Sequence, residues 1–221
     1  MERVIFMGTP AFAVPSLRAL AAHYDVGLVV TQPDRPSGRG RALVPPPVKV
    51  AAEELGIPVY QPDTLRSPEA LEALRRVEPA VIVVAAHGEI LRQNVLSLPP
   101  RGCVNVHASL LPRQRGAAPI TASILAGDAV TGVTIMLMDV GMDTGPILSQ
   151  AEEPIRPDDT TATLTARLAE RGARLLVETL PSWLRGELAP QPQDSSQATY
   201  APMIHKEDGL IDWTDPAVAI E

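Results

Sequence analysis

Cysteine and aromatic residues are scarce in this chain of 221 residues. The single cysteine, Cys103, has no partner for an internal disulfide bond, and no group of cysteine and histidine residues has the spacing of metal ligands. We therefore expect a protein of a reducing compartment that holds no metal. Aromatic residues make up only 3% of the chain, so alanine, valine and leucine must fill the core. The content of 45% hydrophobic and 20% charged residues is typical of a globular domain.

Long hydrophobic runs are missing as well. No apolar stretch approaches the ~20 residues that a transmembrane helix needs. The opening residues RVIFMG are typical of a strand, and they lack the charged start, apolar stretch and cleavage site of an export signal. We therefore expect a cytoplasmic protein that has no contact with a membrane.

Positive charge is in deficit only in the last third of the chain. Residues 1–150 hold 13 basic and 13 acidic side chains, whereas residues 151–221 hold 6 basic and 13 acidic ones. The formal net charge of −7 therefore comes entirely from the second part. An acidic total argues against general nucleic-acid binding, although a local basic segment can still contact a phosphate backbone.

One such basic segment lies in the first half of the chain. The stretch TQPDRPSGRGRALVPPP at 31–47 is too rich in proline, glycine and arginine for regular structure, so we expect a long loop. Residues 34–49 carry a net charge of +3, and the alternatives are a solvated loop or a contact with RNA. Its basic residues are Arg35, Arg39, Arg41 and Lys49. Arg113 and Arg115 are expected to belong to the same basic surface.

Short apolar runs alternate with amphipathic segments along the chain. We expect strands at 4–7, 26–30, 57–60, 81–86, 102–106 and 132–138, and helices at 48–56, 67–77, 89–96, 119–126 and from the caps at 158–160 to 180. A further helix begins at Thr9, with Pro10 in its first turn, or at Pro15. The run at 81–86 is the most hydrophobic and should be central. This alternation predicts a doubly wound, mostly parallel, Rossmann-like α/β sheet with helices on both faces.

Ligands of such a sheet bind beyond the carboxyl ends of its strands. Gly8 lies at such an end, but Gly8-Thr9-Pro10 lacks the full G-x-G-x-x-G pattern of a dinucleotide-binding turn. A tight strand-to-helix turn is the simpler interpretation, and a nicotinamide or flavin enzyme is the alternative.

Three polar residues form a candidate site for acyl transfer. Asn105 and His107 lie two positions apart on a strand, so their side chains point the same way, and Asp143 lies in the glycine-rich loop MDVGMDTGP. The amide can stabilise an oxyanion, the imidazole can carry a proton, and the carboxylate can orient the imidazole. A polar strand end that neighbouring loops satisfy is the alternative. The sequence favours a hydrolase with Ser109 as its nucleophile less, because this serine lacks the G-x-S-x-G turn.

Longer stretches resemble a known family. NVHASLLPRQRGAAPI at 105–120, followed by GVTIMLMDVGMDTGPIL at 132–148, resembles the formyltransferase domain of enzymes that use 10-formyltetrahydrofolate. VTQPDRPSGRGRALVPPPVKVAAEELGIPVYQP at 30–62 and YAPMIHKEDGLIDW at 200–213 are similar to the branch of that family that acts on initiator methionyl-tRNA. The resemblance runs from Val4 to Trp213.

The resemblance implies an activity and a set of residues. It implies transfer of a formyl group from 10-formyltetrahydrofolate to the α-amino group of methionyl initiator tRNA, without a metal, and it places the catalytic trio on Asn105, His107 and Asp143. The loop at 34–49 matches the part of the family that contacts the acceptor arm, so the basic residues named above are expected to bind tRNA. Positions expected to contact folate are Ala86, His87, Gly88, Ile90, Ser109, Leu110, Leu111, Pro112, Asp139, Val140 and Gly141.

The resemblance also divides the chain. Residues 1–185 are expected to form the catalytic domain, and residues 186–221 a linker toward a C-terminal tRNA-binding domain that is absent from this chain. The final Ala-Ile-Glu resembles an unfinished helix, which is consistent with a fragment. We expect a monomer.

Three residues depart from the family pattern. His87 stands where tyrosine is usual, Gln114 where tryptophan or tyrosine is common, and Ala108 where glycine or proline is usual. None of the three belongs to the catalytic trio. Other functions remain as alternatives. They are formyl transfer to an amino sugar or a purine precursor, hydrolysis of 10-formyltetrahydrofolate, and binding of folate or RNA without catalysis.

Overall fold

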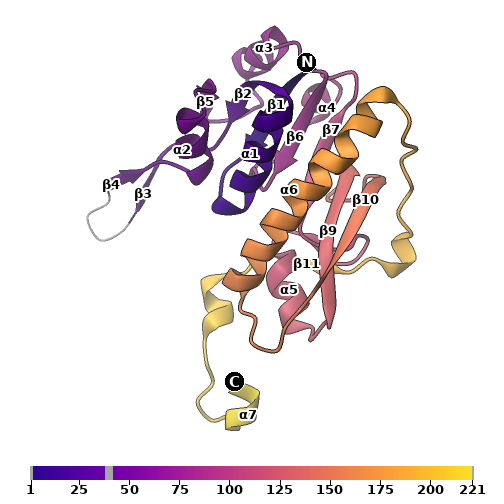
Figure 1. The fold of residues 1–221 in the computed structure, drawn as a ribbon. Coiled ribbons are helices and arrows are strands. Elements are labelled where there is room, and N and C mark those ends of the chain that lie inside the picture. The colour runs from indigo at the N-terminus through magenta and orange to yellow at the C-terminus, as the bar shows by residue number, and fades with distance from the viewer. Residues whose placement is uncertain (1, 38–41, 221) are drawn as a thin grey trace.

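The main sheet of the protein has seven strands, in the order β10-β9-β7-β6-β1-β2-β5 (Figure 1). The computed structural model describes residues 2–37 and 42–220. The strands from β7 to β5 are parallel, whereas β9 runs antiparallel to β7 and β10 antiparallel to β9. The strands are β1 (Arg3–Gly8), β2 (Asp25–Val30), β5 (Val59–Tyr60), β6 (Val81–Ala85), β7 (Cys103–His107), β9 (Val130–Leu137) and β10 (Ile147–Pro154).

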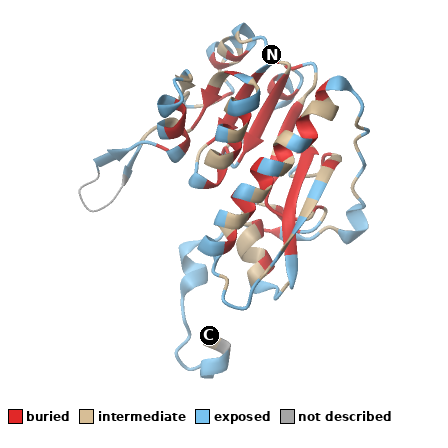
Figure 2. Ribbon diagram, viewed as in Figure 1, coloured by how far each residue is buried: buried red, intermediate tan, exposed pale blue. Residues whose placement is uncertain are grey.

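Helices cover both faces of this sheet, as the sequence predicts. Successive side chains of a strand point to opposite faces. Val4 and Phe6 of β1 therefore pack into one hydrophobic core, and Ile5 and Met7 into the other. Figure 2 shows the buried residues concentrated in the sheet and on the helix faces that cover it. The first core contains α1 (Val14–His23), α2 (Pro47–Glu54) and α6 (Thr161–Arg185), and the second contains α3 (Pro68–Arg76) and α4 (Gln93–Leu96).

The most hydrophobic strand is central, as predicted. β6 is the fourth of the seven strands, and all five of its residues are buried. Because both faces of a parallel sheet are covered, a continuous apolar run is the pattern that such a position requires. β1 and β7 pair with β6, one on each side, and run parallel to it.

The first helix begins later than Thr9. Residues 11–13 form the short helix η1 (Ala11–Ala13), and α1 begins at Val14 with Pro15 in its first turn, so the alternative start near Pro15 is correct. The hydroxyl of Thr9 donates to the carbonyl of His87 at 2.9 Å, and it therefore joins two strand ends. A Cβ atom on Gly8 would lie 2.9 Å from the carbonyl oxygen of Ala85, so glycine allows the close approach of β1 and β6.

The predicted helix at 89–96 is largely wrong, because only α4 is helical there. The Glu89 carboxylate accepts hydrogen bonds from the Thr64 hydroxyl at 2.7 Å and from the Leu65 N–H at 3.0 Å. These contacts hold residues 89–92 in a non-helical path across the end of β6.

The long helix α6 continues past the proline that the sequence pattern takes as its end. Pro181 lies inside it, Leu184 is buried, and the Trp183 indole N–H donates to the carbonyl of Arg101 at 2.9 Å. This packing outweighs the tendency of proline to break a helix. Gly186, with φ at 75°, ends the helix in the left-handed conformation that glycine adopts without strain.

The predicted irregular loop at 31–47 contains a hairpin instead. β3 (Arg35–Ser37) pairs antiparallel with β4 (Ala42–Val44), and Arg35 lies opposite Val44. A two-stranded ribbon has two free edges, so it tolerates Pro36, which has no N–H to donate. Arg39 and Arg41 lie outside the described residues.

The sequence pattern also does not predict β10. Its segment ILSQAEEP carries Glu152 and Glu153 and alternates between more and less exposed residues. Charged residues and a terminal proline are typical of a strand at the edge of a sheet, which β10 is. Such a strand lacks the apolar run that identifies β6.

The chain after α6 first follows the domain surface and then leaves it. Gln191 and Ile147 exchange two backbone hydrogen bonds, both of 2.8 Å, and β11 (Tyr200–Ala201) pairs with β8 (Arg115–Gly116). From residue 202 onward the chain is almost entirely exposed and points away from the sheet (Figure 1). In the described ranges, none of the helices combines the length and the apolar character that a membrane crossing requires. The remaining elements are α5 (Pro119–Leu125), η2 (Ser195–Gln197), η3 (Lys206–Gly209) and α7 (Ala217–Ile220).

Candidate functional site

A cavity of about 570 Å³ opens at the carboxyl ends of β6 and β7. Asn105 and His107 reach it from β7, and Asp143 reaches it from the loop between β9 and β10. The residues that follow β6, Ala86-His87-Gly88, form another part of the wall. The structure therefore brings the predicted amide, imidazole and carboxylate together, although Asp143 is distant from the other two in sequence.

The His107 imidazole is held between a backbone carbonyl and a carboxylate. Its Nε2 lies 3.0 Å from the carbonyl oxygen of Gln114, and its Nδ1 lies 3.6 Å from Oδ1 of Asp143. Because a carbonyl only accepts, Nε2 carries the hydrogen, and the neutral ring then has its lone pair on Nδ1. A lone pair and a carboxylate attract each other only through a proton between them. Nδ1 and the carboxylate are thus two acceptors that face each other in the cavity.

Gln114 owes this contact to its unusual backbone. It is buried, and its φ of 55° is rare for a residue other than glycine. The turn that this conformation makes directs its carbonyl toward the imidazole. In this structure the residue therefore contributes to the site through its backbone.

The loop that carries Asp143 is tightly constrained. Asp143 itself has φ at 53°, and its Oδ2 accepts a hydrogen bond from the N–H of Gly116 at 2.9 Å. A Cβ atom on Gly145 would collide with the carbonyl of Leu137, so only glycine allows the loop to return to the sheet here. Strained backbone of this kind persists only where several contacts fix it.

The Asn105 amide is one polar group of the cavity that has no partner among the described residues. Its side chain is half-buried, and within the described residues it makes no hydrogen bond to another group. The backbone of Asn105 is held in the sheet between Val84 and Met136. A fixed backbone with a free amide is the arrangement that a donor to a bound oxyanion requires.

His87 is buried in the wall of the same cavity, and within the described residues its Nδ1 has no hydrogen-bond partner. Burial lowers the pKa of its imidazole from 6.5 to about 4, against a smaller opposing effect of Glu89. The ring is therefore neutral near pH 7, and its Nδ1 is enclosed by protein without a partner among the described residues.

Replacing His87 by tyrosine is expected to flatten the pH dependence of stability. Because the folded pKa lies below the unfolded one, the unfolded chain binds the proton first. The stability contributed by the neutral ring is complete above pH 6.5 and is lost as the pH falls toward 4. Between pH 7 and pH 4 the wild type should lose about 3 kcal/mol more than the variant.

Denaturant unfolding at pH 7, 5.5 and 4 measures this difference. His23→Tyr, which replaces an exposed imidazole on α1, is the matched control and should follow the wild type. Equal losses for the wild type and His87→Tyr would show that burial of His87 does not oppose its protonation.

A second cavity, of about 190 Å³, adjoins the first and shares Glu89 and Asp143 with it. Four of the residues expected to contact folate line it, namely Ile90, Asp139, Val140 and Gly141. Ala86, His87 and Gly88 line the first cavity. These seven residues are therefore near one another around Asp143.

The remaining four folate positions lie elsewhere. Ser109, Leu110, Leu111 and Pro112 line neither cavity and form the turn behind β7. The Ser109 hydroxyl donates to the carbonyl of Arg113 at 2.7 Å, and the Thr134 hydroxyl donates to the carbonyl of Ser109, also at 2.7 Å. Ser109 thus stabilises a turn and is not placed to act as a nucleophile.

A third cavity, of about 400 Å³, lies at the base of the β3–β4 hairpin and shares Gly88 with the first. Arg35 lines it, and its guanidinium contacts the side-chain oxygen of Gln32 at 3.1 Å. Lys49 is less available, because both carboxylate oxygens of Asp34 accept from its ammonium group at 2.7 and 2.9 Å. Gln61 donates to the same carboxylate and lowers the pKa of Asp34 together with Lys49.

The two arginines beyond β7 differ in exposure. Arg113 is exposed and pairs with Asp128 at 2.6 Å. Arg115 is only 2% exposed, and its guanidinium donates twice to the side-chain oxygen of Gln193, at 2.8 and 3.1 Å. The expectation that Arg115 forms part of an exposed tRNA-binding surface is therefore wrong in this structure.

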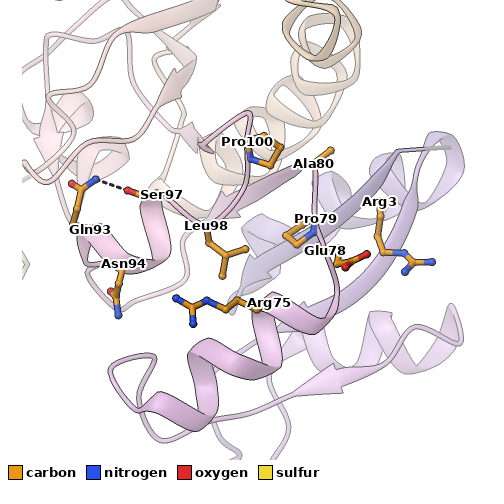
Figure 3. Close-up of a pocket in the computed structure, with 10 residues that line it drawn as sticks. All are labelled: Arg3, Arg75, Glu78, Pro79, Ala80, Gln93, Asn94, Ser97, Leu98 and Pro100. Atoms are coloured by element: carbon orange, nitrogen blue, oxygen red, sulfur yellow. Dashed lines mark hydrogen bonds between the residues drawn. The ribbon is translucent and has the colours of Figure 1, made fainter.

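A larger cavity, of about 1070 Å³, lies at the opposite edge of the sheet, near the start of β1 (Figure 3). Its polar side chains, among them Arg3, Arg75 and Glu78, are exposed. Figure 3 shows them spread around the rim, with one hydrogen bond between Gln93 and Ser97. No group in the figure converges on a common point, so this depression has no features of a catalytic site.

Sequence reasoning missed part of the cavity wall. Phe12 comes from η1, Thr161 and Thr165 from the start of α6, Ile120 from α5, and Met203 from the C-terminal segment. These apolar and small polar residues carry no chemical signal of their own. Only the fold brings them together.

Comparison with known proteins places the chain in a family. The model of the family described as formyl transferase matches residues 2–180. The methionyl-tRNA formyltransferase of Chloroflexus aggregans is 58% identical over 220 residues, which cover 99% of this chain and 71% of that protein.

Solved structures share the fold at low sequence identity. Glycinamide ribonucleotide transformylase 1 from Symbiobacterium toebii matches with a TM-score of 0.71 and 21% identity, over 88% of this chain and 95% of that one. An N-formyltransferase from Helicobacter canadensis, in a complex with folinic acid and dTDP-3-aminofucose, matches with a TM-score of 0.72 and 19% identity, over 100% of this chain and 78% of that one. The family match and the identity to the curated relative together show that the chain belongs to the formyltransferase family.

Proposed function

We propose that the chain transfers the formyl group of 10-formyltetrahydrofolate to the α-amino group of methionyl initiator tRNA. The observation that carries this proposal is the single cavity that holds Asn105, His107 and Asp143, in a chain 58% identical to a methionyl-tRNA formyltransferase. This identity favours methionyl-tRNA as the acceptor over an amino sugar or a purine precursor. The solved enzymes for such acceptors are only 21% and 19% identical in sequence to this chain.

The donor is proposed to bind beside Asp143. The cavities of about 190 and 570 Å³ meet at Glu89 and Asp143, so a folate in the smaller cavity can present its formyl group to the larger one. His87, Gly88 and Ala86 line the wall of the larger cavity beside this junction. The related fold from Helicobacter canadensis was solved with folinic acid, which supports a folate donor.

The proposed reaction begins with attack by the free amine. The amine nitrogen bonds to the formyl carbon, and the carbonyl electron pair moves to oxygen, which gives a tetrahedral oxyanion. The Asn105 amide donates to this oxyanion, while His107, whose Nε2 is engaged with Gln114, keeps Nδ1 toward the Asp143 carboxylate. The carbon–N10 bond then breaks.

The proton follows a balanced path. The attacking nitrogen becomes positively charged and loses a proton to the Asp143 carboxylate, which lies 3.6 Å from Nδ1 of His107 in the same cavity. The same proton returns to N10 of the folate as that nitrogen leaves. The products are formylmethionyl-tRNA and tetrahydrofolate.

One incubation tests the proposal. The protein is mixed with 10-formyltetrahydrofolate and methionyl initiator tRNA, and both formylmethionyl-tRNA and free tetrahydrofolate are measured. Equal amounts of the two products support it. Tetrahydrofolate without formylmethionyl-tRNA would indicate a hydrolase, and an amino sugar nucleotide or glycinamide ribonucleotide as the better acceptor would indicate another branch of the family.

We also propose that the basic hairpin contacts the acceptor arm of the tRNA. Arg35 lines the cavity that adjoins the catalytic one through Gly88, so a strand of RNA at the hairpin can reach the site. In sequence, Arg39 and Arg41 lie between β3 and β4. Lys49 and Arg113 are already paired with carboxylates, and they contribute less free positive charge.

Replacing Arg39 and Arg41 by alanine is expected to weaken the use of tRNA and leave folate binding unchanged. Each lost phosphate contact removes about 0.9 from the slope of log affinity against log salt, so two contacts remove about 2. Measuring kcat/KM for tRNA at several salt concentrations gives the slope. Arg76→Ala, on the exposed face of α3, is the control. A slope equal to that of the wild type would exclude a phosphate contact by the two arginines.

We propose in addition that residues 1–185 form the catalytic domain and that residues 186–221 lead toward a tRNA-binding domain. The relative from Chloroflexus aggregans supports further sequence of this kind, because this chain covers 71% of it. The pairing of residues 191–201 with the catalytic domain indicates that the first part of the linker is fixed on its surface.

A further inference from the structure

The segment after α6 touches the two loops that hold the catalytic pair. Gln193, Thr199 and β11 lie in the segment expected to be a linker, and each makes specific hydrogen bonds to the domain. A simple tether needs no such contacts. Their partners are the backbone around Asp143 and the backbone of residues 114–117.

Gln193 makes four hydrogen bonds through one side-chain amide. Its nitrogen donates to the backbone carbonyls of Asp143 and Gly145, at 2.9 and 2.7 Å. Its oxygen accepts both bonds from the Arg115 guanidinium described above. Arginine only donates and a carbonyl only accepts, so the amide has one orientation that satisfies all four bonds. The buried Arg115 thus sets the direction of Gln193, and Gln193 fixes the Asp143 loop.

Thr199 holds the opposite side of the catalytic pair. Its hydroxyl accepts a hydrogen bond from the N–H of Gln114 at 2.8 Å, and its carbonyl accepts from the N–H of Arg115, also at 2.8 Å. The carbonyl of Gln114 in turn accepts from His107. The positive φ of Gln114 is therefore fixed from the same segment that fixes Asp143.

Two strained residues consequently share one support. Asp143 and Gln114 both have φ above 50°, where residues other than glycine are rare. Each directs one group at the imidazole of His107, a carboxylate on one side and a carbonyl on the other. Such conformations last only where the surroundings over-determine them.

We propose that residues 193–201 form a brace that sets the geometry of the His107–Asp143 pair, with Gln193 as its positioning residue. The brace acts through the backbone of Asp143 and Gln114 and touches no substrate. The proposal rests on the proposed function for its kinetic consequences. Its structural content, the orientation of the His107 ring, is independent of any activity.

Gln193→Glu is the decisive variant. The carboxylate has the shape of the amide and still accepts from Arg115, but it places an oxygen against the carbonyls of Asp143 and Gly145. We expect kcat to fall roughly ten- to a hundredfold, as a small displacement of a catalytic group produces, with KM for 10-formyltetrahydrofolate within about twofold of the wild type. Gln191→Glu is the matched control, since it adds the same charge to the same segment at an exposed side chain and should behave as the wild type.

Two further measurements separate a brace from general stabilisation. The ¹⁵N chemical shifts of the His107 ring report its tautomer and hydrogen bonds, and they should change in Gln193→Glu but not in Gln191→Glu. Thr199→Val, which removes the acceptor for Gln114 and keeps the shape, should change the same shifts and lower kcat.

The outcomes distinguish the two proposals. If the wild type does not formylate methionyl-tRNA, the proposed function fails, and the His107 shifts still test the brace. If the wild type is active, then unchanged kcat and unchanged His107 shifts in both Gln193→Glu and Thr199→Val overturn the brace. A lower melting temperature with unaltered kcat per folded molecule and unaltered shifts also overturns it, because Gln193 is then a structural residue only.

Discussion

Asn105→Ala is expected to lower kcat by roughly a hundredfold or more, while KM for 10-formyltetrahydrofolate stays near that of the wild type. Loss of one donor to an oxyanion typically costs about 2.7–4 kcal/mol of transition-state stabilisation. The Asn105 amide suits this role because its backbone is fixed between β6 and β9, and because within the described residues its side chain makes no other hydrogen bond. It therefore needs no rearrangement when the negative charge develops.

Single-turnover formylation of methionyl-tRNA measures this effect without a contribution from product release. Asn94→Ala is the matched control, since Asn94 is exposed on α4 at the opposite edge of the sheet. Asn105→Ala is also expected to keep its fold, because it removes a half-buried side chain and no hydrogen bond of the described residues. A turnover near that of the wild type would falsify the assignment of the oxyanion donor.

The architecture, and the meeting of the trio Asn105, His107 and Asp143 at one cavity, could be predicted because most of the signals are local patterns. The apolar run of β6 identifies a central strand, and the spacing of two between Asn105 and His107 places both side chains on one face. Asp143 could be added because it follows a strand in a glycine-rich segment. Because β9 runs antiparallel to β7, its end lies beside the start of β7, and only the path of the loop at 138–146 brings Asp143 back to His107.

The supports of the trio could not be predicted, because they depend on contacts between distant segments. A glutamine in a polar, proline-rich stretch carries no local signal, and Gln193 acquires its role only when α6 returns the chain to the site. For Arg115 the sequence gives a signal, but the signal misleads. Its charge and its neighbours suggest an exposed basic surface, whereas pairing of β8 with β11 buries it.

Unusual backbone conformations are a second kind of feature that the sequence pattern does not predict. Gln114 and Asp143 adopt positive φ although neither is glycine. The strain is retained because the neighbouring strands and the segment at 193–201 fix both residues. Both conformations direct a group at the His107 imidazole, which accounts for the strain at these two residues.

Asp143→Asn is expected to lower kcat by roughly 10²- to 10⁴-fold, the range that a general base contributes. The asparagine side chain has the same size, and its oxygen can still accept from the N–H of Gly116, which lies 2.9 Å from the carboxylate in the wild type. The loop should therefore keep its path. A neutral amide cannot take the proton of the attacking amine, so the loss is confined to the chemical step and KM for both substrates should change little.

Asp143→Gly turns this argument into a rescue experiment. Glycine adopts the φ of 53° without strain, which offsets part of the cost of losing the hydrogen bond from the Gly116 N–H, so the variant should still fold. The space beside Nδ1 of His107 is then open to a small carboxylate.

We expect added formate or acetate to restore part of kcat in Asp143→Gly and to leave kcat of Asn105→Ala unchanged, because the latter lacks a donor and keeps its base. Formylation of methionyl-tRNA at increasing acetate concentration and constant ionic strength measures the rescue. Equal responses of the two variants would show that Asp143 acts through the conformation of its loop and not through proton transfer.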